Sequence, residues 1–373
     1  MRAEKRRERN IRNLSTLKYG FHVFCYCRCM TEEEKNNNSN KKDNTFIYRY
    51  IPSGIVREWA DSSGNVSFVR RGEKKAGKCS ADDIFCEEYS VNGDADDPSD
   101  LDTFSHSGVS RMIGALQKEE PEFSLLTLSG AALLALSLYY KAPGAPGAGE
   151  KGKRRTLDNL KDMDSEMKFT LPYLMDLSMA VVDAPEDYAF VLGDHPLYIT
   201  NRLFRGEEAG NGNPLYNRGL IMLIPLTPQR AVMLCDGESY WFHGKDGRFV
   251  LTPEDMRGIN DYMKKRSDTV VIVSEEKYDS VYPGYESYSR DIVNDMNSTD
   301  GDRNTSEPPL LFISISPDAD EDGESTIRRG VSRLLSADAL KIVASGLDPD
   351  DEYVLKLRLE TVLQEREKGK KTE

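Results

Sequence analysis

The stretch Leu220-Ile-Met-Leu-Ile-Pro-Leu-Thr-Pro-Gln-Arg-Ala-Val-Met-Leu234 decides the fold. It contains two apolar runs, at 219–224 and 231–234, and short apolar runs bounded by turn residues are typical of buried strands. Pro225 and Pro228 lie between the runs, where a fixed φ angle and a missing N–H favour a rigid turn. The stretch therefore predicts two neighbouring strands of one sheet.

Similar short segments lie on both sides of this pair. They are bounded by turns and are rich in β-branched and aromatic residues, which favours a mixed or antiparallel sheet. Between the predicted strands at 239–242 and 269–274, Thr252-Pro-Glu-Asp255 has a capping residue, a proline and two acids, which predicts a helix to Arg266. The further strands are predicted at 188–192, 197–199, 239–242 and 269–274.

The middle of the chain is expected to be helical. Phe123 to Tyr140 contains no charged residue, so it is a buried core helix, a single membrane span or an amphipathic anchor. Its minimal length and its Ser, Thr and Gly content favour the core helix. A Pro/Gly-rich flexible loop is predicted at 142–155, and a second helix from Leu157 on through Val181.

The two ends of the chain are more polar. Residues 1–44 comprise a basic segment, with six Arg and Lys residues between Arg2 and Arg12, and a stretch from Thr31 that has no apolar residue and is predicted to be disordered. Strands are predicted at 45–51 and 66–69, paired as a hairpin, with an acidic loop at 91–107. Toward the C-terminus we expect a loop at 275–308, a strand at 310–315 and helices at 336–345 and from Asp351.

These segments together predict an α+β protein in which a helical middle segment packs on a short-stranded mixed or antiparallel sheet, with long polar loops. The 373 residues divide into an arm and disordered loop (1–44), a main α+β domain (45–281) and a C-terminal α/β appendage (282–373).

Charge and cysteine content restrict the partners and the compartment. The net charge of −13 repels a phosphate backbone on average, so nucleic acid is expected only at a local basic patch such as the N-terminal segment. Cys25, Cys27 and Cys29 alternate, a spacing that suits one face of a strand better than a zinc site, and buried reduced thiols are favoured over a metal or redox cluster. No cleavable signal is recognised, so a cytoplasmic protein is predicted and membrane contact is not expected. The oligomeric state is not predicted.

One region resembles a known family. Phe190-Val-Leu-Gly-Asp-His-Pro-Leu-Tyr-Ile-Thr-Asn201 and the 220–234 stretch resemble the family of unknown function numbered 4238, over about residues 120–275. That family has an Asp-Asn-Pro turn after a strand and a later Pro-Leu-Ser-Pro, matched here by 194–196 and 225–228. It also has a helix with a central Asn, which corresponds to Asn260. The resemblance favours a core helix at 123–140.

The chain departs from the family at other positions. The family's opening His-Tyr-Val-Pro motif has only the 19–28 region as its counterpart, and His22 is out of register. The Arg of the helix-ending Arg-x-Pro corresponds to Lys141, and the basic residue expected soon after the Pro is replaced by Gly and Ala. A site formed by those positions in the family is therefore altered in this chain.

Four residues are candidates for chemistry or binding. Asp194 and His195 follow a predicted strand, where a carboxylate beside an imidazole suits acid/base work or a divalent metal. The alternative is structural: an Asp there can accept backbone hydrogen bonds in a turn. Asn201 and Tyr240 are candidate ligand-binding residues, because Asn201 closes the family-like motif and Tyr240 begins an aromatic run.

The function remains open between three classes. The leading hypothesis is an intracellular ligand-binding or interaction protein without its own catalysis, because no complete catalytic motif is present. The second is a metal-assisted nuclease or phosphodiesterase that uses Asp194, His195 and an acidic neighbour such as Asp236. The third is a single-span membrane protein.

Overall fold

The computed structural model describes residues 44–91, 111–142, 177–203, 214–237, 239–242, 247–279, 285–298 and 313–315, with single positions between 162 and 175. All of them lie in one compact unit, residues 43–373. The expectations for Cys25, Cys27 and Cys29, the N-terminal segment, the loops at 91–107 and 142–155 and the helices after 336 lie outside the described residues. The predicted division at residues 281 and 282 stays a prediction.

The larger sheet is mixed and is built around the predicted strand pair. Its order is β11-β5-β9-β8-β7, with β11 parallel to β5 and all other neighbours antiparallel. Pro228 lies in the turn between β8 and β9, as predicted, whereas Pro225 lies inside β8 and pairs with Ala231. A bulge follows between Pro225 and Thr227. The strands are β5 (Ser178–Asp183), β7 (Tyr198–Asn201), β8 (Leu220–Thr227), β9 (Arg230–Cys235) and β11 (Arg248–Val250).

The second sheet joins segments that are distant in the sequence. Its order is β3-β2-β12-β6, antiparallel throughout. Its central strand β12 pairs on one side with β2, which lies some 200 residues earlier, and on the other with the short β6. The strands are β2 (Asn65–Arg70), β3 (Gly77–Ser80), β6 (Leu192–Gly193) and β12 (Thr269–Ile272).

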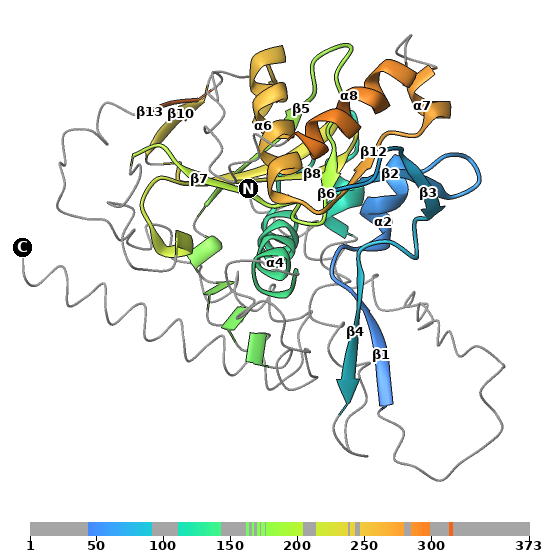
Figure 1. The fold of residues 1–373 in the computed structure, drawn as a ribbon. Helices are drawn as coiled ribbons and strands as arrows, with labels where there is room; N and C mark the ends of the chain where they lie inside the picture. Colours follow the sequence, from blue (N-terminus) through green and yellow to red (C-terminus); the bar gives the residue numbers. More distant parts are fainter. Residues whose placement is uncertain are drawn as a thin grey trace, which may run out of the picture. The chain divides into compact units, whose positions relative to one another are not determined.

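Two ribbons complete the described strands. β1 (Asn44–Arg49) pairs with β4 (Cys86–Val91) and runs toward the bottom of Figure 1, while β10 (Tyr240–Phe242) pairs with β13 (Ile313–Ile315). The predicted hairpin between the first two strands is wrong. Between β1 and β2 the chain forms the short helices α2 (Ser53–Val56) and η3 (Arg57–Trp59), which redirect it, so that β2 pairs with β3 instead.

Helix α4 (Leu125–Lys141) is the predicted core helix. Ser124 caps it by accepting a hydrogen bond from the Thr127 N–H, and its side chains from Ala131 to Lys141 are buried. It lies below the strands in Figure 1 and contacts β9. The membrane-span alternative for this stretch is wrong, and among the described residues no helix combines the length and apolar character that crossing a bilayer needs.

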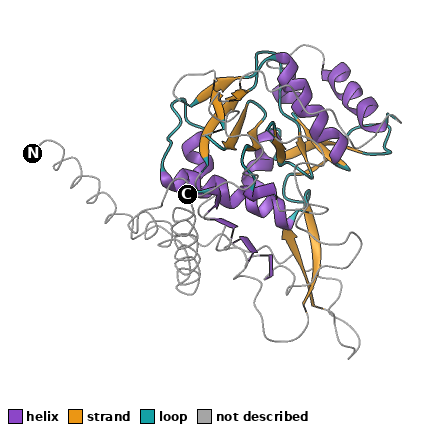
Figure 2. Cartoon of the chain, turned by 90° about the vertical axis from the view of Figure 1, so that its left-hand side faces the viewer, coloured by secondary structure: helices purple, strands orange, loops and turns teal. Residues whose placement is uncertain are grey.

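Helix α6 (Pro253–Arg266) also begins as predicted. Thr252 accepts the Asp255 N–H, and Pro253 occupies the first turn. The helix lies above the strands in Figure 1, and Figure 2 shows strands with helices on both sides.

The loop predicted at 275–308 is wrong, because this region contains helices α7 (Glu275–Asp279) and α8 (Tyr285–Asn297). Tyr285, Tyr288, Ile292 and Met296 recur at helical spacing and give α8 an inner face, which a mostly polar sequence conceals.

Two further boundaries differ from the sequence prediction. Val181 lies within β5, so the second helix does not extend that far. Of the strand predicted at 188–192, only Leu192 enters a sheet. The residues before it are held by the Pro228 carbonyl, which accepts the Phe190 N–H at 2.8 Å, and by the side chain of Asn260. The predicted mixed α+β class is confirmed.

Candidate functional site

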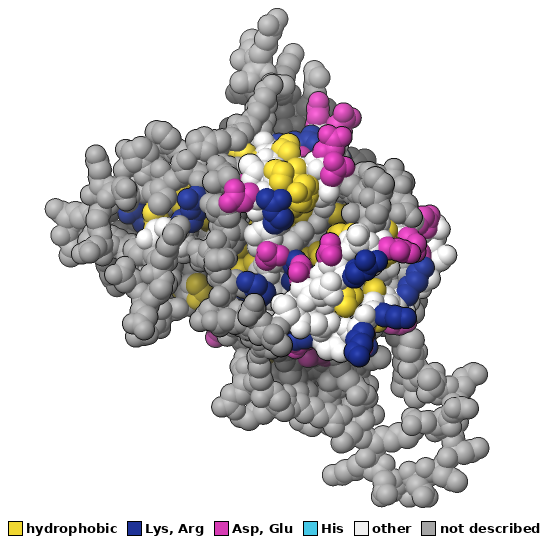
Figure 3. All heavy atoms as spheres, turned by 45° about the horizontal axis from the view of Figure 1, so that its top comes forward, with side chains coloured by type: hydrophobic (Ala, Val, Ile, Leu, Met, Phe, Trp, Pro, Cys, Tyr) yellow, Lys and Arg dark blue, Asp and Glu magenta, His cyan; other side chains and the backbone are white. Residues whose placement is uncertain are grey.

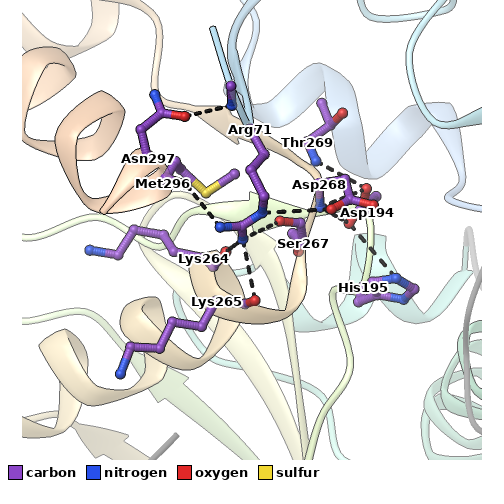
Figure 4. Close-up of polar contacts among 11 residues, drawn as sticks. Arg71, Asp194, His195, Lys264, Lys265, Ser267, Asp268, Thr269, Met296 and Asn297 are labelled. Carbon is purple, nitrogen blue, oxygen red and sulfur yellow. Dashed lines mark hydrogen bonds and ion pairs between the residues drawn. The ribbon is translucent and has the colours of Figure 1, made fainter. Parts of the chain in front are cut away.

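Asp194 lies where β6 ends beside the start of β12. Its own N–H donates to the Thr269 carbonyl at 2.9 Å. Its carboxylate accepts the backbone N–H groups of Asp268, at 3.2 Å, and Thr269, at 3.0 Å (Figure 4). The residue therefore links the corner between α6 and β12 to the end of β6, through amides that are distant in sequence and not through the local amides of its own turn.

Burial sets the acidity of this carboxyl group. Removal from water raises the pKa of Asp194 to about 6, and the charge of Asp268 acts in the same direction. Hydrogen bonds from the backbone N–H groups of Thr269 and Asp268 oppose the rise because they favour the ionised form. Asp194 can thus exchange a proton near neutral pH while it remains bound to backbone amides.

His195 lies close to this carboxylate. The Nε2 atom is 4.0 Å from Asp194 Oδ1, with the side chains 22% and 14% exposed, respectively. Adjacent residues of an extended strand point to opposite faces, so the turn after β6 brings the two groups together. A carboxyl and an imidazole at this separation form an ion pair when the imidazole is protonated.

Arg71, which sequence analysis did not single out, lies on the other side of the same corner. Its guanidinium donates to the carbonyls of Lys264 at 2.8 Å, Ser267 at 2.7 Å and Met296 at 2.8 Å (Figure 4). These carbonyls belong to the C-terminal ends of α6 and α8, which lack intrahelical partners. An arginine just after a strand gave no signal of this role, because the helix ends that it binds lie about 200 residues away.

Asn201 and Tyr240 meet at Gly219. Asn201 donates to the Arg218 carbonyl at 2.5 Å and accepts the Leu203 N–H at 3.0 Å. The Tyr240 hydroxyl donates to the Gly219 carbonyl and accepts the Arg202 N–H at 3.0 Å. Both predicted ligand-binding residues thus bond backbone groups around one turn.

Asp236 belongs to this second cluster. It accepts the Gly219 N–H at 2.8 Å and the Ser239 hydroxyl at 2.7 Å. Gly219 has a φ angle of +76°, which a glycine adopts without strain. Asp236 lies just after β9 of the larger sheet and Asp194 just after β6 of the smaller one, so the two carboxylates are bonded to different backbone segments.

A third polar cluster was also missed. Asp183 accepts Arg230 Nε at 2.7 Å and also binds Arg248 Nε. Arg230 in turn donates to the carbonyls of Leu116 and Lys118 at 2.9 and 2.7 Å. The cluster ties residues 111–120 to the end of the larger sheet.

Lys141, which lies before the span that matches the family model, is almost fully buried at the end of α4. Its ammonium lies 5.7 Å from the centroid of the Tyr48 ring, a cation–π arrangement. Next to it, the Tyr140 hydroxyl, Thr170 and the Tyr216 hydroxyl form a chain with separations of 3.2 and 3.1 Å. Lys141 is therefore an interior cation beside tyrosines.

Metal-binding groups do not gather in the part of the chain that the structure describes: no cluster there brings three His, Cys, Asp or Glu side chains together. Asp194 and His195 supply two such groups, and both carboxylate oxygens accept backbone N–H groups. Among the described cysteines, Cys79, Cys86 and Cys235 are in the thiol form, and Cys235 Sγ donates to the Ser178 carbonyl at 3.7 Å.

The fold and these clusters define a mixed α+β protein whose buried polar side chains bind its own backbone. Residues 143–277 match the family described as Protein of unknown function (DUF4238), and the chain therefore contains a DUF4238 domain over this span. The predicted resemblance is confirmed, with the matched span beginning just after α4. No curated protein and no solved structure matches the chain.

Proposed function

We propose that the protein is an intracellular ligand-binding or interaction protein that performs no catalysis of its own. The observation that carries the proposal is the bonding of Asp194, the strongest sequence candidate for catalysis. Its carboxylate accepts the N–H groups of Asp268 and Thr269, so its lone pairs are directed at the fold. A general base or a metal ligand needs lone pairs directed at a substrate or an ion.

The other candidates support the same conclusion. Tyr240 uses its hydroxyl both as donor, to Gly219, and as acceptor, from Arg202. Asn201 uses both ends of its amide on backbone groups. Breaking these buried bonds to bind a substrate would cost about 1–3 kcal/mol for each group left unsatisfied. The thiol form of the three described cysteines supports a reducing compartment.

A thermal-shift screen of the full chain against nucleotides, oligonucleotides and divalent ions tests this proposal, with product analysis of each mixture that shifts the melting temperature. We expect at least one shift and unchanged ligand after prolonged incubation. Release of product by the wild-type protein, lost in Asp194→Asn, would contradict the proposal.

The second candidate function is hydrolysis that uses Asp194 and His195, with or without a divalent metal. It is favoured by the 4.0 Å separation of the two side chains and by the raised pKa of Asp194, about 6, which suits proton transfer near neutral pH. This alternative predicts that Asp194→Asn abolishes activity and leaves the melting temperature nearly unchanged. A large loss of stability in the same variant would instead support the structural role.

A further inference from the structure

The hairpin formed by β2, β3 and the turn between them is strongly basic. Residues 70–78 read Arg-Arg-Gly-Glu-Lys-Lys-Ala-Gly-Lys, five cations and one acid, in a chain whose net charge is −13. We name these nine residues the basic hairpin. Its sign is opposite to that of the chain as a whole, so composition alone does not account for it.

The base of the basic hairpin is fixed to the rest of the fold. The Arg71 guanidinium binds carbonyls at the ends of α6 and α8, and the Arg71 N–H donates to the Asp268 carbonyl at 2.9 Å. The side chain of Asn297 accepts the Gly72 N–H and donates to the Glu73 carbonyl. The guanidinium of Arg71 is therefore already bonded to backbone carbonyls. The turn that follows Arg71 is fixed by these bonds before any partner binds.

The other four cations of the basic hairpin are exposed to solvent, but they differ in whether an acid neutralises them. Lys74 and Lys75 are exposed and have no hydrogen bond or ion pair with the described residues. Arg70 is exposed, with its guanidinium 4.7 Å from the Phe68 ring centroid and 3.8 Å from Glu73. Lys78 is paired with Asp61 at 2.5 Å. Lys74, Lys75 and the stacked Arg70 are therefore the groups that an incoming anion can reach.

Two acids from outside the basic hairpin lie close to its cations: Asp61 pairs with Lys78, and the Asp268 carboxylate is 3.6 Å from Arg71 Nε. At physiological salt the Debye length is about 8 Å, so exposed acids farther away than this are largely screened. Figure 3 shows acidic and basic side chains interspersed over one face, with Lys and Arg gathered toward its lower right. A ligand at the basic hairpin responds mainly to the charges nearest to it.

We propose that the basic hairpin binds the phosphate backbone of a nucleic acid, without reading its sequence. The proposal rests on the binding function proposed above and names its partner. Adjacent, unpaired Lys74 and Lys75 match an anion with closely and regularly spaced charges, and duplex DNA carries one charge per about 1.7 Å of its axis. Lysines bind phosphate as mobile point charges, which suits contact with a backbone and not with particular bases.

Fluorescence anisotropy with a labelled 20-base-pair duplex of random sequence, titrated with NaCl, tests the proposal on the full chain. The test variant is Lys74→Ala/Lys75→Ala. Because each phosphate contact contributes about 0.9 to the slope of log K against log salt, we expect the slope to fall by about 1.8. The affinity at low salt should fall about tenfold or more.

The matched control is Arg111→Ala/Lys118→Ala, which removes the same charge from two other exposed residues. It should leave the slope unchanged. This comparison also separates the basic hairpin from the basic N-terminal segment, which is identical in both variants.

The outcomes distinguish failure of this proposal from failure of the proposed function. Equal loss in both variants, or no duplex binding by the wild type at low salt, where electrostatic binding is strongest, would overturn the basic hairpin as a nucleic-acid site. Binding of poly-glutamate instead of the duplex, lost in Lys74→Ala/Lys75→Ala, would contradict nucleic acid as the partner. It would still agree with the proposed interaction function. Cleavage of the duplex by the wild type would overturn the proposed absence of catalysis and leave the basic hairpin as a binding site.

Discussion

Asp194 shows how a residue that sequence analysis marks for chemistry can be bonded to the fold. The sequence predicted that Asp194 follows a strand, and it left two hypotheses open, a structural role in a turn and a catalytic role. It could not predict the partners, because Asp268 and Thr269 are 74 and 75 residues away. Only the pairing of β6 with β12 brings these groups together.

Replacing Asp194 by Asn tests the structural role. The Asp268 N–H lies 3.2 Å from both carboxylate oxygens, and the Thr269 N–H binds Oδ2. Asn places an NH2 group, which cannot accept, at one of these two oxygen positions and removes the negative charge, so the backbone N–H groups are bonded less well, at a cost of about 1–3 kcal/mol. Urea denaturation at pH 7 should show this loss of unfolding free energy. Asp291→Asn, on the exposed side of α8, is the control and should be neutral. An unchanged midpoint for Asp194→Asn would favour the catalytic alternative.

The same residue predicts a pH dependence. The folded-state pKa of Asp194, about 6, exceeds its ordinary value of 3.8, so the folded protein holds this proton more tightly than the unfolded chain. The stability that this proton contributes is complete below pH of about 4 and is lost as the pH rises through about 6. The wild type should therefore lose up to about 3 kcal/mol relative to Asp194→Asn over this range. Parallel curves for the two proteins would contradict the shift.

Gly193, in the same short strand, should not tolerate a side chain. A Cβ atom there would lie 2.1 Å from the hydroxyl oxygen and 3.1 Å from the Cβ of Ser267, which is fully buried, so Ser267 would have to shift within a packed interior. We expect Gly193→Ala to cost about 1–3 kcal/mol by overpacking. Adding Ser267→Ala should recover part of the loss.

Gly114→Ala is the control for this substitution, because a Cβ atom there meets no other atom within 4 Å. Gly114→Ala should leave the melting temperature unchanged or raise it, and Gly193→Ala should lower it, when thermal unfolding of both variants is measured. Equal effects at Gly193 and Gly114 would show that the contact with Ser267 is not limiting.

At the scale of elements, the sequence predicted those with a clear local signal. The β8–β9 pair has apolar runs and prolines, and α6 has its cap at Thr252, and both form as expected. Helix α8 was missed because the residues of its inner face are interspersed with charged and polar ones. The 188–192 segment was assigned to a sheet because apolar runs do not reveal whether the partner is a strand or a side chain.

Asn260 replaces a neighbouring strand for that segment. Its side-chain oxygen accepts the Val191 N–H at 3.1 Å, and its nitrogen donates to the Ala189 carbonyl at 2.8 Å. This bonding gives a physical role to the central Asn expected from the family resemblance. An amide is needed because one residue must act both as donor and as acceptor.

Asn260→Ala should therefore destabilise the protein by about 2 kcal/mol or more, since it leaves two backbone groups unsatisfied. Asn260→Asp keeps the acceptor and should cost less at pH 7 than the alanine variant. Asn294→Ala, at an exposed position of α8, is the control. Equal midpoints for Asn260→Ala and Asn294→Ala in chemical denaturation would contradict this role.

At the scale of the molecule, the fold extends beyond the span that matches the family. β12 lies inside residues 143–277, but its partner β2 lies outside, as does α4 against β9. The sequence could not predict this dependence, because pairing between strands 200 residues apart leaves no local pattern. The ties from Arg230 to residues 116 and 118 make the same connection.

A fragment of residues 143–277 should therefore fail to fold alone. It would expose the edge of β12 and the face of the larger sheet that α4 covers. We expect no cooperative thermal transition by circular dichroism for the fragment, and one for residues 43–373. A sharp melt of the fragment would show that the matched span is an independent domain.

The indole of Trp59 connects these two parts of the chain directly. It is fully buried, and its Nε1–H donates to the Phe190 carbonyl at 2.8 Å across 131 residues of sequence. The fluorescence emission maximum of an indole shifts to longer wavelength when the side chain becomes exposed to water. Trp59 emission therefore reports whether this contact is formed. The chain has only two tryptophans, so Trp241→Phe leaves Trp59 as the single tryptophan. The emission of this variant would report whether the segment around Trp59 is packed against residues 143–277.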